Sequence, residues 1–142
     1  MERVNDLENI FPHWDIGAPT PTLLADEHKV NLAYYTQELD VALITFSHCF
    51  EYKMGMPDEN LVGNHRLGKK GLREYEAHLI ENSEWITELE KNYKVISNYS
   101  RDGRQYQHYV FTFHDRSFEC IASDYTIQIK TNTRIIQVLK SL

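Results

Sequence analysis

Alternation of apolar and polar side chains is the main pattern along the chain, and it predicts β-strands. Side chains of a strand point to opposite faces in turn, so a period of two marks a strand with one buried face. The segments with this pattern are residues 22–25, 30–35, 41–52, 75–80, 107–114, 117–123 and 125–130. The polar residues 26–29 separate the first two segments and predict a hairpin turn.

The clearest predicted hairpin covers residues 107–123, with its turn at Asp115–Arg116. This register brings apolar side chains together in three pairs, which are Phe113 with Phe118, Phe111 with Cys120, and Tyr109 with Ala122. The opposite face then carries His114 and Glu119 as diagonal neighbours, within reach of each other.

Two segments change to helical spacing. Residues 83–93 predict an amphipathic helix, because Asn82–Ser83 supplies an N-cap and Glu84 lies in the first turn. Its apolar positions are Trp85, Ile86, Leu89 and Tyr93. Asn132–Thr133 predicts the cap of a short C-terminal helix, whose inward side chains are Ile135, Ile136, Leu139 and Leu142.

These elements predict one α+β domain over residues 1–142. We expect a strongly twisted or curled antiparallel sheet of about six or seven strands, with helix 83–93 covering one face or one open end. Residues 1–20 are expected to form a lead-in segment because proline and glycine interrupt them. Residues 53–72 predict a long loop, since four glycines and one proline lie among polar and basic residues. Residues 97–105 predict a turn.

Charge and cysteine content limit the cellular locations and the classes of partner that we expect for the protein. The chain has 15 Lys and Arg against 21 Asp and Glu, a net charge of −6, so no nucleic-acid partner is expected. No segment reaches the ~20 apolar residues of a membrane span, and no secretory signal is visible. Cys49 and Cys120 lie in apolar runs without C-x-x-C spacing, which favours buried, reduced thiols. We therefore expect a soluble cytoplasmic protein.

Seven histidines raise the question of a metal site. A metal ion needs three or four ligands at one point, yet the chain has no H-x-H, H-E-x-x-H or C-x-x-C spacing. His108 and His114 lie roughly 20 Å apart on one predicted strand, because a strand rises about 3.3 Å per residue. His48 lies between Phe46 and Phe50, which favours a hydrogen-bonded core histidine. No metal and no cofactor are expected.

Three polar clusters are candidate sites. His114 and Glu119 could act as acid and base, since a carboxylate beside an imidazole raises its pKa; the alternative is a solvated turn with a surface ion pair. The basic loop residues His65, Arg66 and Lys69 could hold a phosphate or carboxylate, although the P-loop pattern is missing and a solvated flexible loop is the alternative. A third cluster, in the first hairpin turn, contains Asp26 and His28 and has the same solvated alternative.

Several stretches resemble a family of small uncharacterised bacterial proteins. They are Ala25-Asp26-Glu27-His28, Ala33-Tyr34-Tyr35, Gly71-Leu72 and, above all, Phe111 to Cys120, which reads FTFHDRSFEC. The resemblance covers most of the chain from about Gly17 onward. Because no activity is known for that family, the resemblance implies no role for any residue and only draws attention to the hairpin.

Two functions follow as hypotheses. One is a non-enzymatic binding or protein-interaction module, immunity-protein-like in size and charge, whose partner is expected to be basic. The alternative is a small enzyme or small-molecule-binding protein with a pocket between residues 55–72 and the last hairpin. There His114 and Glu119 would act as acid and base, while His65 or Arg66 would hold a small anionic ligand. Exposed strand edges and many aromatic residues favour a homodimer.

Overall fold

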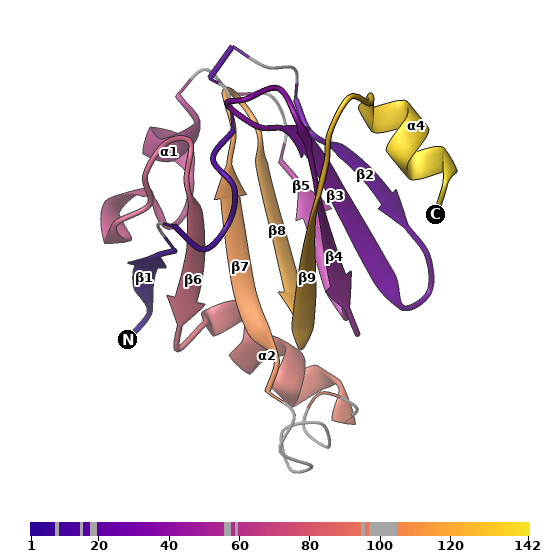
Figure 1. Ribbon diagram of the computed structural model, residues 1–142. Coiled ribbons are helices and arrows are strands. Elements are labelled where there is room, and N and C mark those ends of the chain that lie inside the picture. The colour runs from indigo at the N-terminus through magenta and orange to yellow at the C-terminus, as the bar shows by residue number, and fades with distance from the viewer. Residues whose placement is uncertain are drawn as a thin grey trace.

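The strands of the protein form two antiparallel sheets, as the computed structural model in Figure 1 shows. It describes residues 1–142 except 8, 15, 18–19, 56–57, 59, 95 and 97–104, so the turn expected over 97–105 lies almost wholly outside the described residues. One sheet has the order β1-β6-β7-β8-β5 and the other the order β2-β3-β4-β9. The strands are β1 (Arg3–Asp6), β2 (Thr22–Ala25), β3 (Lys29–Tyr35), β4 (Val41–Ser47), β5 (Glu51–Met54), β6 (Ala77–Glu81), β7 (Gln107–Thr112), β8 (Ser117–Ala122) and β9 (Asp124–Lys130).

The α+β class with mostly antiparallel strands is confirmed, but the single curled sheet is wrong. Neither of the two sheets is strongly curled. The strand expected over residues 41–52 is in fact β4 and β5, which belong to different sheets. The chain changes direction at His48, whose φ is 49°, a left-handed conformation that no strand contains. Alternation continues on both sides of this break, which is why the sequence pattern reads as one strand.

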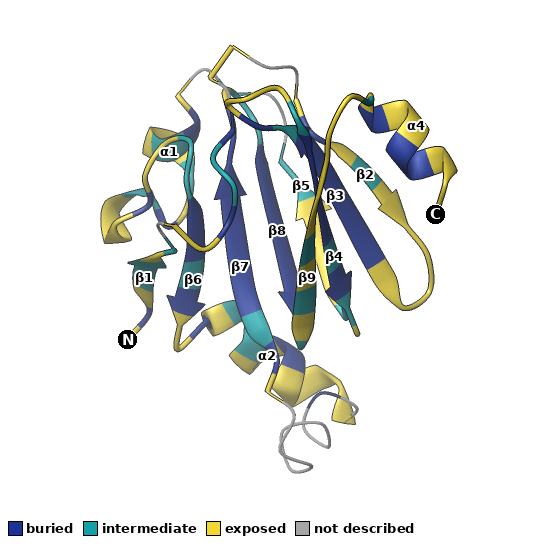
Figure 2. Cartoon of the chain, viewed as in Figure 1, coloured by how far each residue is buried: buried dark blue, intermediate teal, exposed yellow. Residues whose placement is uncertain are grey.

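Aromatic rings join the inner faces of the two sheets. Phe46 of β4 is fully buried, and its ring centroid lies 5.4 Å from that of Tyr109 on β7 and 5.7 Å from that of Phe118 on β8. In Figure 2 the central strands β3, β4, β7 and β8 are dark blue over most of their length. One apolar core therefore lies between the two sheets, and each sheet keeps an outer face for other elements.

The lead-in segment takes part in the fold more than expected. Residues 3–6 form strand β1 at the edge of the five-stranded sheet, paired with β6. Trp14 is buried in the core, with its ring centroid 4.7 Å from that of Phe113, and its Nε1–H donates to the Thr112 carbonyl at 3.1 Å. The polar N–H of this indole is thus satisfied where it is buried.

The β7–β8 hairpin is confirmed, with its turn moved by one residue. Phe113 N–H donates to the Arg116 carbonyl at 2.8 Å, which places His114 and Asp115, rather than Asp115 and Arg116, at the tip. The observed pairs are Phe111 with Phe118, Tyr109 with Cys120, and Val110 with Glu119. Moving the turn by one residue changes the register by two, so every side chain keeps its predicted face but has a different partner.

Short helices and one irregular segment cover the outer faces. Helix α2 (Glu84–Asn92) begins as predicted, with the Ser83 hydroxyl accepting from the Ile86 N–H at 3.2 Å. The expected loop over residues 53–72 contains the end of β5, a single helical turn α1 (Leu61–Asn64) and the 3-10 turn η1 (Gly68–Lys70). Between them, α2 and residues 61–72 cover part of the outer face of the five-stranded sheet, through Leu89 on Ile121 and Leu67 on Val110.

Helix α4 (Ile135–Lys140) covers the outer face of the four-stranded sheet. Ile135 and Leu139 are buried there as expected, together with Val138. Ile136 and Leu142 were expected to face inward, but both are exposed, and Leu142 lies beyond the end of the helix. No helix in the described part of the chain is long and apolar enough to cross a membrane.

Phe46→Ala should strongly destabilise the protein, because the substitution leaves a cavity between the two sheets. We expect the free energy of unfolding to fall by about 3–5 kcal/mol, measured by urea titration followed by circular dichroism. Ile136→Ala removes an exposed side chain from α4 and serves as the control, with a change of less than about 0.5 kcal/mol. Equal effects of the two substitutions would contradict a core shared by both sheets.

Candidate functional site

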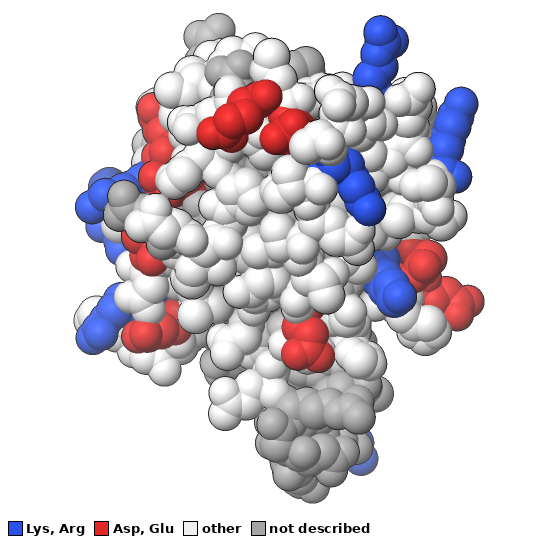
Figure 3. All heavy atoms as spheres, viewed as in Figure 1, with Lys and Arg blue, Asp and Glu red and all other residues white. Residues whose placement is uncertain are grey.

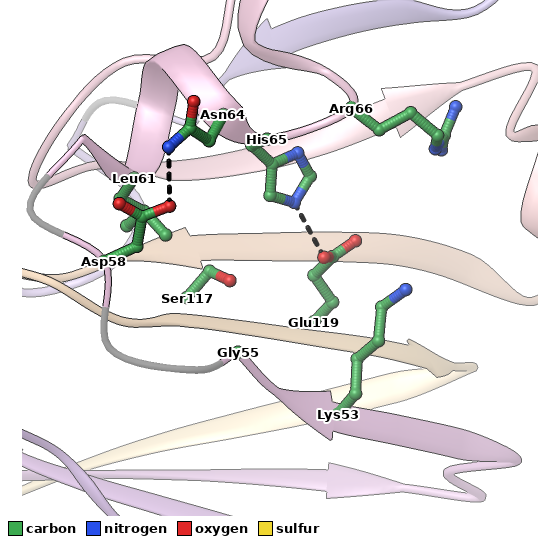
Figure 4. Close-up of a pocket in the computed structure, with 9 residues that line it drawn as sticks. All are labelled: Lys53, Gly55, Asp58, Leu61, Asn64, His65, Arg66, Ser117 and Glu119. Atoms are coloured by element: carbon green, nitrogen blue, oxygen red, sulfur yellow. Dashed lines mark hydrogen bonds and ion pairs between the residues drawn. The ribbon is translucent and has the colours of Figure 1, made fainter.

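A buried carboxylate lies on the outer face of the five-stranded sheet, in the gap between helix α2 and residues 61–72. Glu119 of β8 points away from the aromatic core, and only 6% of its side chain is exposed. Lys53 of β5 lies directly beside it across the strands. Figure 4 shows His65 pointing down toward Glu119 from the end of α1 and Arg66 pointing away from it.

Two imidazoles hold the Glu119 carboxylate. His65 Nε2 lies 2.8 Å from Glu119 Oε2, and His108 Nε2 lies 2.9 Å from Oε1. The Leu67 N–H donates to His65 Nδ1 at 3.0 Å, so this nitrogen carries no proton and Nε2 is the donor to Glu119. An ionised carboxylate only accepts, so His108 also donates from Nε2. Both rings are therefore oriented by the carboxylate.

Helix α2 is joined to the same network. The Ser83 hydroxyl, which caps α2, lies 2.8 Å from His108 Nδ1. Ser83 and His108 are both buried, so neither group has water as an alternative partner. A chain of hydrogen bonds therefore runs from the first turn of α2, through the His108 ring, to the carboxylate on β8.

The network keeps Glu119 ionised. Burial alone would raise the pKa of this carboxyl, but the hydrogen bonds from His108 and His65, with the nearby charge of Lys53, outweigh burial and hold the pKa far below its usual range. A base with so low a pKa takes up a proton poorly near neutral pH. Glu119 is thus a fixed negative charge rather than a group poised to titrate.

Two hollows adjoin at Glu119. The larger has a volume of about 460 Å³ and is lined by Lys53, Gly55, Asp58, Leu61, Asn64, His65, Arg66, Ser117 and Glu119. The smaller, of about 210 Å³, is lined by Lys53, Arg66, Glu84, Trp85, Glu88 and Glu119. Because Lys53, Arg66 and Glu119 belong to both, we treat the two hollows as one feature and call it the Glu119 groove. Its larger part has a volume typical of a small-molecule site.

A second buried carboxylate, Glu2, fixes the basic loop beside the groove. Arg66 donates to both Glu2 oxygens, at 2.6 and 3.2 Å, and Lys70 donates to Oε1 at 3.0 Å. Glu2 also accepts from the Glu84 N–H at 2.9 Å, at the start of α2. Figure 3 shows basic and acidic side chains next to each other along the edge that carries α1. Arg66, one of the loop residues expected to bind an anion, is therefore already paired.

The structure corrects the partner of Glu119. His114 was expected beside it, but His114 is exposed at the hairpin tip, where its Nδ1 lies 2.9 Å from the Tyr75 hydroxyl. The shifted register instead makes His108 the diagonal neighbour of Glu119 on the same face. A catalytic role for His114 loses the contact on which the hypothesis rested.

The other predicted residues are divided between the two sheets. His65 and Arg66 both line the Glu119 groove, which lies between residues 55–72 and the last hairpin as the small-molecule hypothesis expected. Lys69 is exposed in η1 and does not line the groove. Asp26 and His28 lie in the β2–β3 turn of the other sheet.

The Asp26 carboxylate stabilises its own turn. It accepts from the N–H groups of His28 and Lys29, both at 2.8 Å, and these bonds lower its pKa. The solvated-turn alternative therefore describes this cluster. His48, expected in the core, is exposed and lies 3.3 Å from the Ser123 hydroxyl, because the chain leaves β4 at this residue.

Sequence reasoning missed most of the groove. His108 was considered only for a metal, and Ser83 only as a helix cap. Placing the turn at His114–Asp115 would have brought His108 to Glu119, since the turn alone sets the register. The sequence did not indicate that Lys53, Asp58 and Ser117 line a common groove. These residues come together only through the pairing of β5 with β8 and through the fold of the loop. Among the described residues, no three His, Cys, Asp or Glu side chains are grouped to hold a metal ion.

No family model, no curated protein and no solved structure matches this chain. Function is therefore argued from the groove itself.

The buried Glu2 carboxylate should make stability depend on pH in the acid range. Hydrogen bonds from Arg66, Glu84 N–H and Lys70 outweigh burial and lower the pKa of Glu2 from 4.5 to about 2. The unfolded chain therefore binds more protons between these values, and stability is present above pH 4.5 and lost as the pH falls toward 2. Glu2→Gln should reduce the slope of unfolding free energy against pH by up to about 1.4 kcal/mol per pH unit.

Urea titrations at a series of pH values across this window measure the slope. Glu81→Gln is the matched control, because the Glu81 ion pair with Arg3 is exposed on both sides and should leave the slope unchanged. A Glu2→Gln slope equal to that of the unsubstituted protein would contradict the proposed pairing.

Proposed function

We propose that this protein binds a small polar molecule in the Glu119 groove. The observation that carries the proposal is that Glu119, an ionised and buried residue, lines an open hollow of about 460 Å³. A carboxylate has about four acceptor positions, and the two imidazoles use two of them. The rest are available to hydrogen-bond donors of a ligand.

The groove offers a ligand both apolar and polar contacts. Leu61 and Trp85 supply apolar surface at its two parts, while Asp58, Asn64 and Ser117 supply polar groups. Most of its lining side chains are polar or charged, which suits a polar ligand that can pair with them. Glu119 is held by His108 of β7 and by His65 after α1, and the Ser83 hydroxyl at the start of α2 in turn contacts His108.

Binding fits these residues better than proton transfer. Both ring nitrogens of His65 are engaged, one by the Leu67 N–H and one by Glu119, so this ring has no free position from which to act on a substrate. Both nitrogens of His108 are engaged as well. Glu119 itself is a weak base, for the reason given above. A site of this kind orients a ligand through fixed charge.

The protein-partner and homodimer hypotheses stay predictions. They rest on size, charge and strand edges, whereas the groove gives the small-molecule hypothesis a defined location.

A fragment screen tests the proposal. We expect small polar fragments to shift the amide signals of Gly55, Asn64 and Glu119 in ¹H–¹⁵N correlation spectra. Asn64 is exposed at the rim of the larger hollow, so Asn64→Tyr should fold normally, obstruct the hollow and reduce the shifts of Gly55 and Glu119 at least severalfold.

Asn92→Tyr is the matched control, because Asn92 is also exposed but lies at the end of α2 and lines neither hollow. Its fragment shifts should equal those of the unsubstituted protein. Hits that leave the groove amides unchanged, or shifts that persist in Asn64→Tyr, would rule out the groove as the binding site.

A further inference from the structure

We propose that the ligand of the Glu119 groove is an organic cation, a small molecule with an ammonium or guanidinium group, which donates to the Glu119 carboxylate. This inference rests on the proposed function and adds the chemical class of the ligand. It reverses the anionic ligand that the sequence suggested, for reasons that lie in the placement of three charged side chains.

The first reason is the acceptor at the centre of the groove. Glu119 Oε1 and Oε2 each accept one imidazole N–H, and each oxygen keeps a further lone pair. Glu119 lines both hollows, so a ligand in either hollow lies beside this acceptor. An ammonium or guanidinium group has donors only and therefore matches this acceptor, whereas a carboxylate or phosphate would be repelled by it.

The second reason is that Arg66 is turned away from a ligand. Its guanidinium donates to Glu2 through both terminal nitrogens and lies 3.4 Å from a Glu84 oxygen. Figure 4 shows the side chain extending away from Glu119 and Ser117. The positive charge of Arg66 is thus compensated by carboxylates outside the larger hollow, and an anion there would gain little from it.

The third reason is the balance of charge along the groove. Among its described lining residues there are four carboxylates and two basic side chains; the acids are Asp58, Glu84, Glu88 and Glu119, and the bases are Lys53 and Arg66. A hollow with an excess of one sign concentrates ligands of the opposite sign. The groove therefore favours a cation.

The groove already accommodates an alkylammonium of its own. Lys53 Nζ lies over the Trp85 ring, 4.5 Å from its centroid, and Lys53 is the cross-strand neighbour of Glu119. An ammonium over an indole ring is stabilised by the ring face, and the charge of Lys53 also acts on the Glu119 carboxylate. Lys53 therefore shows that this environment suits an amine, and its charge also competes with a bound cation. Removal of the Lys53 charge should strengthen cation binding and weaken anion binding, which makes it a test of sign.

Three probes of four carbons separate the ligand classes. They are 1,4-diaminobutane, butane-1,4-diol and succinate, each titrated at neutral pH and the same ionic strength while the amide signals of Gly55, Asn64 and Glu119 are followed. We expect saturable shifts with the diamine and none with the diol or succinate. Glu119→Gln should abolish the diamine shifts, and Asn64→Tyr, which leaves the network intact, should reduce them at least severalfold.

Lys53→Met should tighten diamine binding by about three- to tenfold, because a nearby like charge is removed. Lys140→Met is the matched control; it changes the net charge equally but lies on α4, over the other sheet, and should leave the affinity unchanged. This comparison separates a local effect from the attraction of any cation to an acidic protein.

Weaker diamine binding in Lys53→Met, or the same change in Lys140→Met, would overturn the inference. Groove shifts with succinate or the diol but not with the diamine would also overturn it, and would leave the proposed function in place. If none of the three probes binds while other fragments still bind in the groove, the cation inference is also overturned and the proposed function stands. The proposed function itself is overturned by a fragment screen without groove hits, or by fragment shifts that persist in Asn64→Tyr.

Discussion

An ionised carboxylate inside a protein has to be compensated where it lies, and the arrangement around Glu119 depends on this requirement. Its two oxygens receive imidazole donors from β7 and from the segment after α1. His65 is in turn oriented by the Leu67 N–H, and His108 by Ser83 at the start of α2. The charge on β8 thus joins its neighbouring strand β7 to the segment after α1 and, through His108, to the start of α2.

Glu2, at the edge of the same sheet, is a second buried carboxylate whose charge is compensated by neighbouring donors. Its carboxylate joins β1 to Arg66 and Lys70 and accepts from the first turn of α2. Residues 61–72 have a small apolar contact with the sheet, through Leu67 and Leu72, and much of their remaining attachment is ionic. This explains how a segment rich in glycine keeps a defined shape beside the groove. It also couples that shape to the ionisation of two carboxyl groups.

His65 and Arg66, which help to hold residues 61–72 in place, also line the proposed binding groove. A carboxylate fixed by two imidazoles is oriented before a ligand arrives, so little ordering of the protein is needed on binding. The same bonds occupy the imidazole nitrogens, which removes them from acid–base chemistry. The ring nitrogens of His65 and His108 make structural hydrogen bonds, so they are not free to transfer protons to or from a substrate.

The sequence by itself determined where most of the strands lie and where helix α2 begins. Period-two alternation covered every strand of the described residues except β1, and Ser83 with Glu84 located the start of α2, because these signals depend only on near neighbours in the chain. It also placed Glu119 on the face opposite the aromatic core, and this assignment survived a turn displaced by one residue.

Tertiary structure decided which elements meet. Alternation is the same in one strand or two, so the break at His48 and the division into two sheets were not visible in the sequence. The pairs Glu119–His65, Lys53–Glu119 and Arg66–Glu2 join residues far apart in the chain. Such pairs depend on how the strands are ordered and on where a glycine-rich segment comes to rest. Both are fixed by packing and buried charge over the whole domain, rather than by local spacing.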